Sequence, residues 1–431
     1  PIMRLHSTLH PFIRKEPWTF PAQARATIQT QLLQSMEKVT SLADLVNHYN
    51  QMAGDPGYAG KDLARYAQLT PAGVSATVAK WLQKDHRVVV QAQPGAQVLP
   101  PEVPTPPAPT KAALGELESL NALQSWLNKA PGAAKAKPLT LPAAQSFTLP
   151  NGLTVIHSPK PGLPLVSASL VLRAGQGANP ADRPGLAGFT AAMLSEGTTT
   201  RSAQQIAEAT AALGATLNAQ AGPEEARIDF SGLKASAKDG LALLADLALN
   251  PAFAEPEIAR QKAQRLAALA QAREQAPLLA NAVGNRVTYG EGTPLAANAL
   301  GTEASIKAVD AAALRAFWQA HYRPERAALV VAGDLSEAEL RALIEPLFGS
   351  WKPSGDAAPA TPLPPARPIA ARTVLVDKPG APQTALAVVA PGPFAGAPDT
   401  ADIKVMNAAL GGLFTSRINT QLREVKGYTY G

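Results

Sequence analysis

The chain contains no cysteine among its 431 residues. This absence excludes disulfide bridges and thiolate metal sites, and it leaves the redox compartment undetermined. Aromatic residues are also scarce, at 5% of the chain, and no apolar run is long enough to cross a bilayer. We therefore expect a protein without a membrane span.

Charge of one sign is not concentrated in any part of the sequence. The 39 Lys and Arg residues are scattered among 33 Asp and Glu residues, for a formal net charge of +6. Because no basic stripe stands out, we expect no nucleic-acid partner. The hydrophobic fraction of 46% and the abundant alanine predict helix-rich α+β domains, and the length suits about two to four compact units.

The two ends of the sequence suggest a fragment. The chain begins with Pro1, shows no signal-peptide pattern, and ends at Gly431 inside what we interpret as a domain. We expect any targeting information to lie upstream. The lack of cysteine and the Ala- and Pro-rich composition favour an exported, periplasmic protein.

Two proline-rich stretches, residues 94–143 and 356–371, divide the chain. Their composition predicts extended, semi-rigid linkers. They separate three patterned segments, residues 1–93, 144–355 and 372–431. We interpret each patterned segment as a separate domain or part of one.

Hydrophobic periodicity and capping residues predict the main elements. Helices are predicted at residues 22–38, 42–52, 72–82, 202–213, 237–250, 257–274, 337–347 and 402–410. Strands are predicted at residues 87–91, 166–173, 215–219, 227–233, 327–331, 374–376 and 385–389. Asn151-Gly152, between two apolar runs, predicts a hairpin over residues 147–156.

One further helix, at residues 185–198, is central to the interpretation. It is entered through Pro184-Gly185 and closed by Gly197. Its spacing places four apolar side chains on one buried face: Leu186, Phe189, Met193 and Leu194.

This helix resembles the active-site helix of the M16 metallopeptidases, the family of pitrilysin, insulinase and the mitochondrial processing peptidase. That family carries the inverted zinc motif H-x-x-E-H within the frame G-L-A-H-F-L-E-H-M-L-x-x-G-T. The frame residues present here are Gly185, Leu186, Ala187, Phe189, Met193, Leu194, Gly197 and Thr198. Gly188 and Ala192 stand at the two histidine positions, and Ala191 stands at the position of the glutamate base. Since Gly and Ala offer no donor atoms, the resemblance implies a unit without zinc.

The third zinc ligand of the family is a Glu on a later helix, roughly seventy to eighty residues downstream. Here that helix is predicted at residues 257–274, with no acid between Glu257 and Glu274. Ala268 or Leu269 falls at the ligand position. All three ligand positions are therefore expected to be empty of donors, and the helix at 185–198, taken alone, is an ordinary core helix.

The resemblance extends over most of the patterned sequence. Residues 1–93 resemble the C-terminal part of a first M16 repeat, residues 144–355 an N-terminal-type domain, and residues 372–431 the start of a truncated C-terminal-type domain. It implies an α+β fold of M16 (LuxS/MPP-like) sheet-and-helix rolls, with two partial repeats joined by the Pro-rich linker.

A second family feature lies at the end of the chain. Two-part M16 enzymes pair a zinc-binding half with a half that supplies an Arg and a Tyr, spaced as L-R-x-x-x-x-x-x-Y. Leu422-Arg423 with Tyr430 fits that pattern. The resemblance implies that Arg423 and Tyr430 bind the peptide and stabilise an oxyanion. Tyr428 and Arg417 are the alternatives for the two roles, and a solvated helix end with a packing tyrosine is the simpler interpretation.

The resemblance also implies partners. Asn218 and Ala219 lie where family members pair an edge strand with a peptide substrate. The partner would be a zinc-bearing catalytic M16 half, in the same chain or in another subunit, so no cofactor is expected in this chain and it should be inactive alone. The alternatives are a degenerate M16 scaffold or assembly subunit, like the core subunits of the respiratory bc1 complex, and a peptide-binding shell without chemistry.

Overall fold

The computed structural model describes residues 21–83, 142–353, 355–358, 369–394 and 396–431, with residues 86–88, 90–91, 95, 129, 132, 135 and 138 between them. The chain divides into a larger unit, residues 1–69 with 144–431, and a smaller unit, residues 70–143. Most of the two predicted linkers lies outside the described residues, so the domain boundaries stay a prediction. No helix in the described ranges has the length and apolar character that a membrane span requires.

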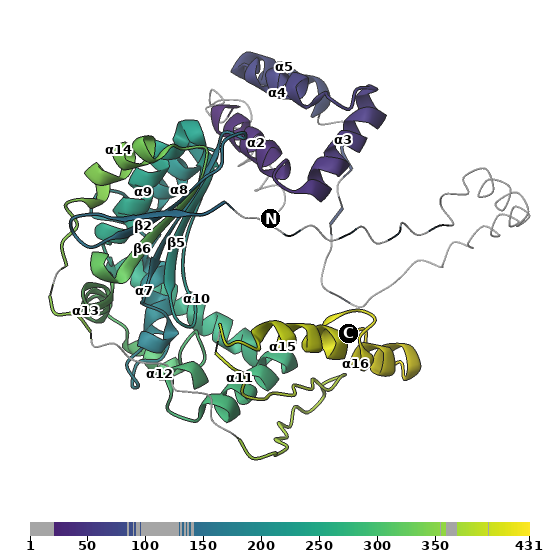
Figure 1. Ribbon diagram of the computed structural model, residues 1–431, viewed down its shortest axis with the longest axis vertical. Coiled ribbons are helices and arrows are strands. Elements are labelled where there is room, and N and C mark those ends of the chain that lie inside the picture. Colours follow the sequence, from purple (N-terminus) through teal and green to yellow (C-terminus); the bar gives the residue numbers. More distant parts are fainter. Residues whose placement is uncertain are drawn as a thin grey trace, which may run out of the picture. The chain divides into compact units, whose positions relative to one another are not determined.

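A mixed sheet forms the centre of the larger unit (Figure 1), with strand order β1-β2-β6-β3-β5-β4. The strands are β1 Gln145–Thr148, β2 Thr154–Pro159, β3 Leu165–Leu172, β4 Thr216–Ala221, β5 Ala226–Leu233 and β6 Ala327–Gly333. β2 and β6 are parallel, and the other neighbouring strands are antiparallel. The predicted hairpin forms β1 and β2, and the α+β class is confirmed.

The two faces of this sheet differ in polarity because apolar and polar residues alternate along its strands. On β5, Ile228 and Phe230 are buried, whereas Asp229 lies on the opposite face. There Asp229 accepts a hydrogen bond from Ser169 Oγ of β3 at 2.6 Å. One face therefore packs into the core while the other stays polar.

Helices cover the apolar face of the sheet (Figure 1). In chain order they are α7 Leu186–Leu194, α8 Ala203–Ala212, α9 Ala237–Leu249, α13 Ala311–His321 and α14 Glu337–Phe348. Helix α10 Glu255–Arg273 packs against α7, and α11 Ala276–Tyr289 and α12 Glu303–Ala308 pack against α10. α7, α9, α13 and α14 share one core cluster with the strands, to which they contribute Phe189, Leu244, Leu314 and Ile344. Helices α11, α12 and α13 were not predicted from the sequence.

The first described residues form further helices, α2 Pro21–Ser35, α3 Val39–Ala53 and α4 Ala59–Ala67. α2 reaches the sheet, since Gln34 Nε2 donates to Ser231 Oγ at 3.1 Å. In the smaller unit, α5 Pro71–Trp81 begins as predicted, with the Thr70 side chain accepting from the Gly73 amide.

The strand predicted at residues 87–91 is wrong, because residues 87, 88, 90 and 91 belong to no strand. Val88 and Val90 are exposed. A β-strand needs a partner for its backbone groups, and none is described in the smaller unit.

The last segment of the larger unit contains α15 Thr400–Asn407, a π-helical turn over residues 408–412, α16 Arg417–Asn419 and a second π-helical turn, Thr420–Val425. The strands predicted at residues 374–376 and 385–389 are wrong, because neither run is paired in a sheet. Both runs instead line one cavity together with α11, and a Cβ on Gly284 of α11 would lie 3.1 Å from Val389 Cγ1.

Candidate functional site

Helix α7 is held in place by its entry. Gly185 has φ of 87°, a left-handed conformation that favours glycine, and a Cβ there would lie 2.6 Å from the Leu300 oxygen. The Oδ1 atom of Asn179 accepts from the Ala187 amide at 2.7 Å and so caps the start of the helix. The M16-like frame thus orients α7 through a tight backbone contact and a side-chain cap.

The predicted buried face of α7 is confirmed, because Leu186, Phe189, Met193 and Leu194 are all at most 3% exposed. Three positions of α7 correspond to the family's zinc ligands and glutamate base but carry no such side chain. Of these, Ala191 is buried, while Gly188 and Ala192 are partly exposed. Gly188 and Ala192 are one turn apart and therefore share a face of the helix.

A guanidinium group lies against that face of α7. Arg265 of α10 donates from Nη2 to the backbone oxygen of Gly188 at 2.6 Å, and its Cζ lies 4.8 Å from the ring centroid of Phe189. Its Nε has no hydrogen-bond partner among the described residues. Burial lowers the pKa of Arg265 to about 10, so the side chain is still a cation at neutral pH.

A second contact joins the same two helices one to two turns further on. The Glu196 carboxylate, beyond the end of α7, accepts from Gln261 Nε2 at 2.7 Å and also from Arg260 of α10. At the predicted position of the third ligand, Leu269 is buried hydrocarbon at 7% exposure. Hydrogen bonds and packing therefore hold α7 and α10 together.

These residues do not fit a zinc ion. A zinc site needs three or four nitrogen, oxygen or sulfur ligands, and Gly188, Ala192 and Leu269 provide none from their side chains. The adjacent Arg265 cation would repel a divalent metal. Within the ranges that the structure describes, no group of three or more His, Asp or Glu side chains is placed to hold a metal ion.

The predicted peptide-binding residues Asn218 and Ala219 lie on β4, at the edge of the sheet. β4 pairs with β5, where Asn218 lies opposite Asp229 and Ala219 opposite Ile228. No other described strand covers its outer side. A free edge presents backbone N–H and C=O groups that can pair with an extended chain. α7 is in contact with β4, so this edge adjoins the helix that corresponds to the family's zinc-binding helix but lacks its zinc-ligating side chains.

The structure brings Arg423 and Tyr430 together through the tyrosine backbone and, more loosely, through its ring, whose centroid lies 5.9 Å from Arg423 Cζ. Arg423 Nη1 donates to the Tyr430 carbonyl oxygen at 3.0 Å, and its Cζ lies 4.5 Å from the ring centroid of Phe414. The side chains of Tyr430 and Tyr428 are 91% and 76% exposed. No described hydrogen bond or ion pair links Arg423 or Tyr430 to α7 or β4, so their roles stay a prediction.

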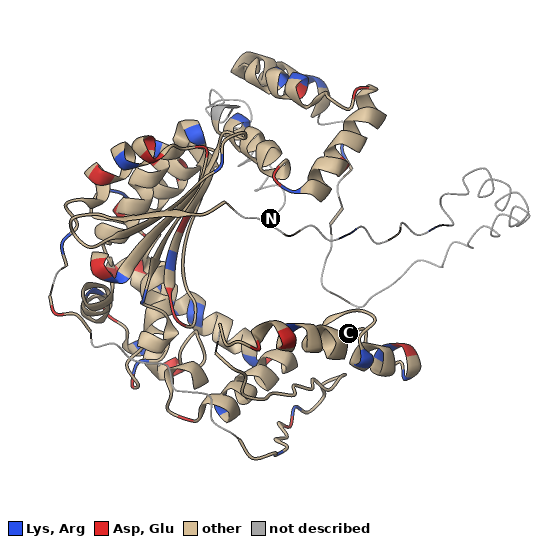
Figure 2. Ribbon diagram, viewed as in Figure 1, with Lys and Arg blue, Asp and Glu red and all other residues tan. Residues whose placement is uncertain are grey.

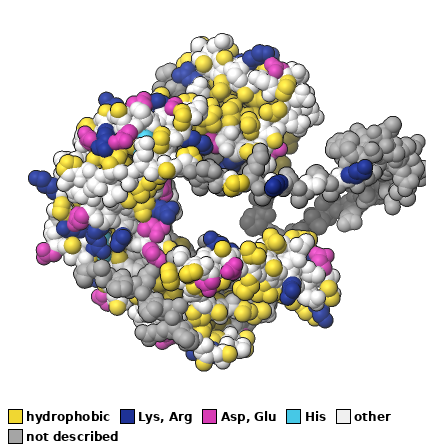
Figure 3. All heavy atoms as spheres, viewed as in Figure 1, with side chains coloured by type: hydrophobic (Ala, Val, Ile, Leu, Met, Phe, Trp, Pro, Cys, Tyr) yellow, Lys and Arg dark blue, Asp and Glu magenta, His cyan; other side chains and the backbone are white. Residues whose placement is uncertain are grey.

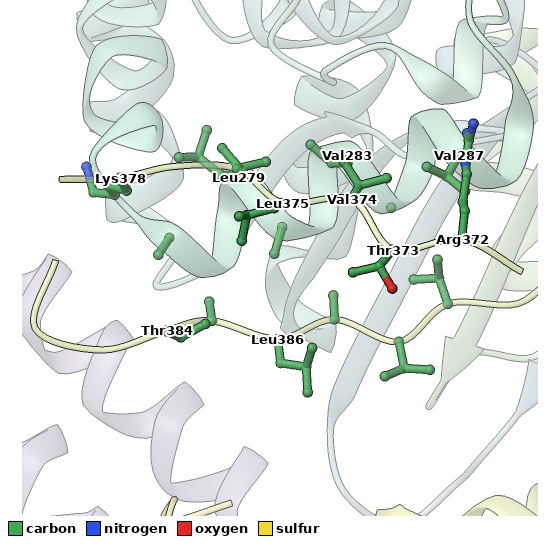
Figure 4. Close-up of a pocket in the computed structure, with 18 of the residues that line it drawn as sticks. Leu279, Val283, Val287, Arg372, Thr373, Val374, Leu375, Lys378, Thr384 and Leu386 are labelled. Atoms are coloured by element: carbon green, nitrogen blue, oxygen red, sulfur yellow. The ribbon is translucent and has the colours of Figure 1, made fainter.

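Two cavities adjoin α11. One, of about 840 Å³, is lined by α11 and residues 369–391 and is mostly apolar. Figure 4 shows Leu279 and Val283 of α11 beside Val374 and Leu375 of the extended run. The other, of about 610 Å³, lies among α10, α11 and the loops before α7 and α12.

The surface shows where charge and apolar groups lie. Basic and acidic residues are interspersed over the larger unit without a single-sign stripe (Figure 2). Apolar side chains lie exposed over the C-terminal helices (Figure 3), among them Val405 at 72% and Phe414 at 61%.

Arg265 and the arginines of the second cavity, Arg273 and Arg286, were not predicted from the sequence as site residues. A signal for Arg265 was present, because it lies four residues before Leu269 and so shares a face of α10 with the third ligand position. Its hydrogen-bond partner, Gly188, is 77 residues away and could not be found from spacing.

Comparison with known protein families identifies two matching models. One, described as insulinase (peptidase family M16), matches residues 154–298. The other, described as the peptidase M16 inactive domain, matches residues 308–431.

Among curated proteins, the uncharacterized zinc protease YmxG of Bacillus subtilis is 26% identical over 287 residues, which are 66% of this chain and 68% of that protein. An uncharacterized zinc protease of Rickettsia bellii is 32% identical over 203 residues, 47% of this chain and 49% of its own length. The chain therefore spans about half of the Rickettsia relative.

Two solved structures share the fold. A peptidase M16 inactive domain from Pseudomonas fluorescens has a TM-score of 0.57 at 24% identity, covering 67% of this chain and 69% of its own. A protease from Helicobacter pylori has a TM-score of 0.59 at 19% identity, covering 67% and 70%.

Proposed function

This chain belongs to the M16 peptidase family, and from that premise we propose that it is the zinc-less half of an M16 zinc endopeptidase. The observation that supports this most concerns α7, which has the frame residues of the family motif but not its zinc ligands. Arg265 lies against Gly188, at the position of the first histidine ligand. In this proposal the chain binds peptide and does not itself hold the metal. Zinc in a catalytic half, within a longer chain or a partner subunit, would supply the activated water.

The first task of this chain is to hold the peptide in an extended form. The outer edge of β4 at Asn218 and Ala219 offers backbone groups for this purpose. Pairing of this kind uses main-chain hydrogen bonds, which supply affinity for an extended peptide.

The second task belongs to Arg423 and Tyr430. Arg423 Nη1 is bonded to the Tyr430 backbone oxygen and Nε lies 3.3 Å from Glu424 Oε1, which leaves Nη2 as the nitrogen that would donate to a peptide carbonyl or carboxylate. With the Tyr430 hydroxyl, it would donate to an oxyanion that forms in the shared site.

A complementation assay tests this function. The chain is mixed with an M16 half that carries H-x-x-E-H, and hydrolysis of a fluorogenic peptide is followed. We expect no turnover from the chain with zinc alone, chelator-sensitive turnover from the mixture, and a large loss with Arg423→Ala. Chelator-sensitive turnover by the chain alone, or a mixture no faster than the catalytic half by itself, would contradict the proposal.

The exposed apolar surface favours a second candidate, a degenerate M16 assembly subunit. Val405, Phe414 and Tyr430 are all more than half exposed on the C-terminal segment, and such surfaces mark sites of protein association. This candidate predicts that the chain forms stable complexes in sedimentation experiments and does not bind peptide. It also predicts that Arg423→Ala has no effect on peptide hydrolysis by the mixture with the catalytic half.

A further inference from the structure

The cavity of about 610 Å³ beside α10 and α11 has the size of a ligand site. It lies next to Leu269 and to the loop residues 179–184 that lead into α7. The loop over residues 291–302 also lines it. The cavity is therefore separate from Gly188, although it adjoins Leu269, at the position of the family's third zinc ligand.

Its walls are held in place by contacts that need no ligand. Gln176 Nε2 donates to the oxygens of Pro294 and Ala297, each at 2.8 Å. Ser305 Oγ donates to the Pro184 oxygen at 2.9 Å. A Cβ on Gly301 would lie 2.5 Å from that same oxygen, so the two loops touch through their backbones. A preformed cavity loses little conformational entropy when a ligand enters.

Two arginines without acidic partners line this cavity. Arg273 comes from the last turn of α10 and Arg286 from α11. In the described part of the chain neither forms an ion pair. Glu303 is near enough to have its pKa lowered, first by Lys307 and to a smaller extent by Arg273, but it is paired with Lys307 at 2.6 Å.

The remaining lining residues limit the chemistry of a ligand. Glu291 is the acidic residue of the lining, so the cavity carries one net positive charge, which suits a monoanion better than a phosphate dianion. Leu269, Leu279 and Val283 add apolar surface. Asn179, 6% exposed, has an Nδ2 group without a partner among the described residues.

We propose that this cavity binds the C-terminal carboxylate of a peptide whose last side chain is apolar. The carboxylate would pair with Arg273 and Arg286, since planar guanidinium groups bind carboxylates through two parallel hydrogen bonds. The apolar side chain would contact Leu279 and Val283. This inference rests on the proposed peptide-binding function and adds a preference for substrates with a free carboxyl end.

A pair of labelled peptides tests it directly. Two short peptides ending in Leu, identical except that one is a free acid and the other a C-terminal amide, are titrated with the chain and followed by fluorescence anisotropy. We expect the acid to bind about tenfold more tightly or better, the equivalent of one charge-assisted hydrogen bond. Arg273→Gln and Arg286→Gln should each reduce binding of the acid towards that of the amide and leave the amide unchanged.

The control is Arg341→Gln, since Arg341 lies outside the cavity and is paired with Glu337 at 2.7 Å. It should leave both affinities unchanged. Equal binding of acid and amide would overturn the carboxylate site while leaving the proposed peptide binding intact. If the unmodified chain binds neither the acid nor the amide, both the proposed function and this inference are overturned. Displacement of the acid by inorganic phosphate at equal concentration would also overturn it, by showing a general anion site.

Discussion

Arg265 Nη2 donates a hydrogen bond to the backbone oxygen of Gly188 at 2.6 Å. A Cβ added to Gly188 would lie 3.8 Å from Nη1 and 3.9 Å from Nη2 of the same guanidinium. A methyl group fits this space, but an imidazole at position 188 would meet the guanidinium. The cation therefore occupies the region that a histidine ligand and its metal would need.

Restoring the ligands alone should not restore zinc binding. We expect a variant with Gly188→His, Ala192→His and Leu269→Glu to bind zinc weakly, and the same variant with Arg265→Ala to bind about a hundredfold more tightly, because a cation within a few ångströms repels the metal. Competition with a zinc-sensitive dye measures both affinities.

Arg341→Ala in the same background is the control and should change nothing. Because the third ligand position is either 268 or 269, Ala268→Glu replaces Leu269→Glu in a parallel set. Tight zinc binding with Arg265 still present would show that the guanidinium does not block the site.

Removing the charge of Arg265 should stabilise the fold. Burial lowers the pKa of Arg265 to about 10, so the folded state disfavours the cation relative to the unfolded chain. We expect Arg265→Met to raise the free energy of unfolding by about 1 kcal/mol at neutral pH, since a buried ion is often less favourable than a hydrocarbon of similar volume. Urea unfolding measures the difference.

The pH dependence of that difference has a definite sign. Above pH 10 the folded state releases the proton before the unfolded state does, so the stability of the unmodified chain rises with pH. The advantage of Arg265→Met should therefore shrink from about pH 10 upward. A destabilised Arg265→Met variant at neutral pH would mean that the contact with Gly188 outweighs the cost of burial.

Asp246 should stabilise the loop that follows α7. Its carboxylate accepts from Thr198 at 2.9 Å, Thr200 at 2.8 Å, Arg201 at 2.6 Å and Asn250 at 2.9 Å. Burial raises its pKa, but the four hydrogen bonds outweigh that effect and the pKa is lowered overall. We expect Asp246→Ala to cost about 2–3 kcal/mol in the free energy of unfolding near neutral pH.

This stabilisation is present above the ordinary Asp pKa of about 3.9 and is lost as pH falls through the lower folded value. The difference between Asp246→Ala and the unmodified chain in urea unfolding should therefore narrow below about pH 4. Asp239→Ala, on the exposed side of the same helix α9, should have little effect at any pH. A pH-independent difference for Asp246→Ala would assign its effect to packing.

The outer edge of β4 should be required for peptide binding. Successive residues of an antiparallel strand direct their N–H groups to opposite sides, so Asn218 or Ala219 has its N–H on the free edge and the other faces β5. We expect proline at the outward-facing position to abolish binding of an extended peptide with little change in Tm. Proline at the other position should lower Tm by several degrees because it removes a bond to β5. If neither substitution weakens binding in folded protein, the peptide binds elsewhere.

Sequence alone determined the elements whose cause is local. The helices predicted at residues 202–213 and 337–347 are present, and Ser202 and Ser336 cap them, each in a capping box with a later Gln or Glu. The alternation at residues 166–173 and 227–233 predicted β3 and β5, because a half-buried strand must change polarity at every residue. The absence of donor atoms at Gly188, Ala191 and Ala192 is likewise a fact of composition that no fold can change.

Only the tertiary structure decided what depends on a distant partner. Residues 374–376 and 385–389 have the composition of strands, yet they form none, because a ladder needs a neighbouring strand and composition does not supply one. The contact of Arg265 with Gly188 and the shared cavity of Arg273 and Arg286 join residues from different helices. Spacing along a chain reports which side chains share a face of one element, whereas a charge acquires its partner, or is left without one, only when separate elements pack together.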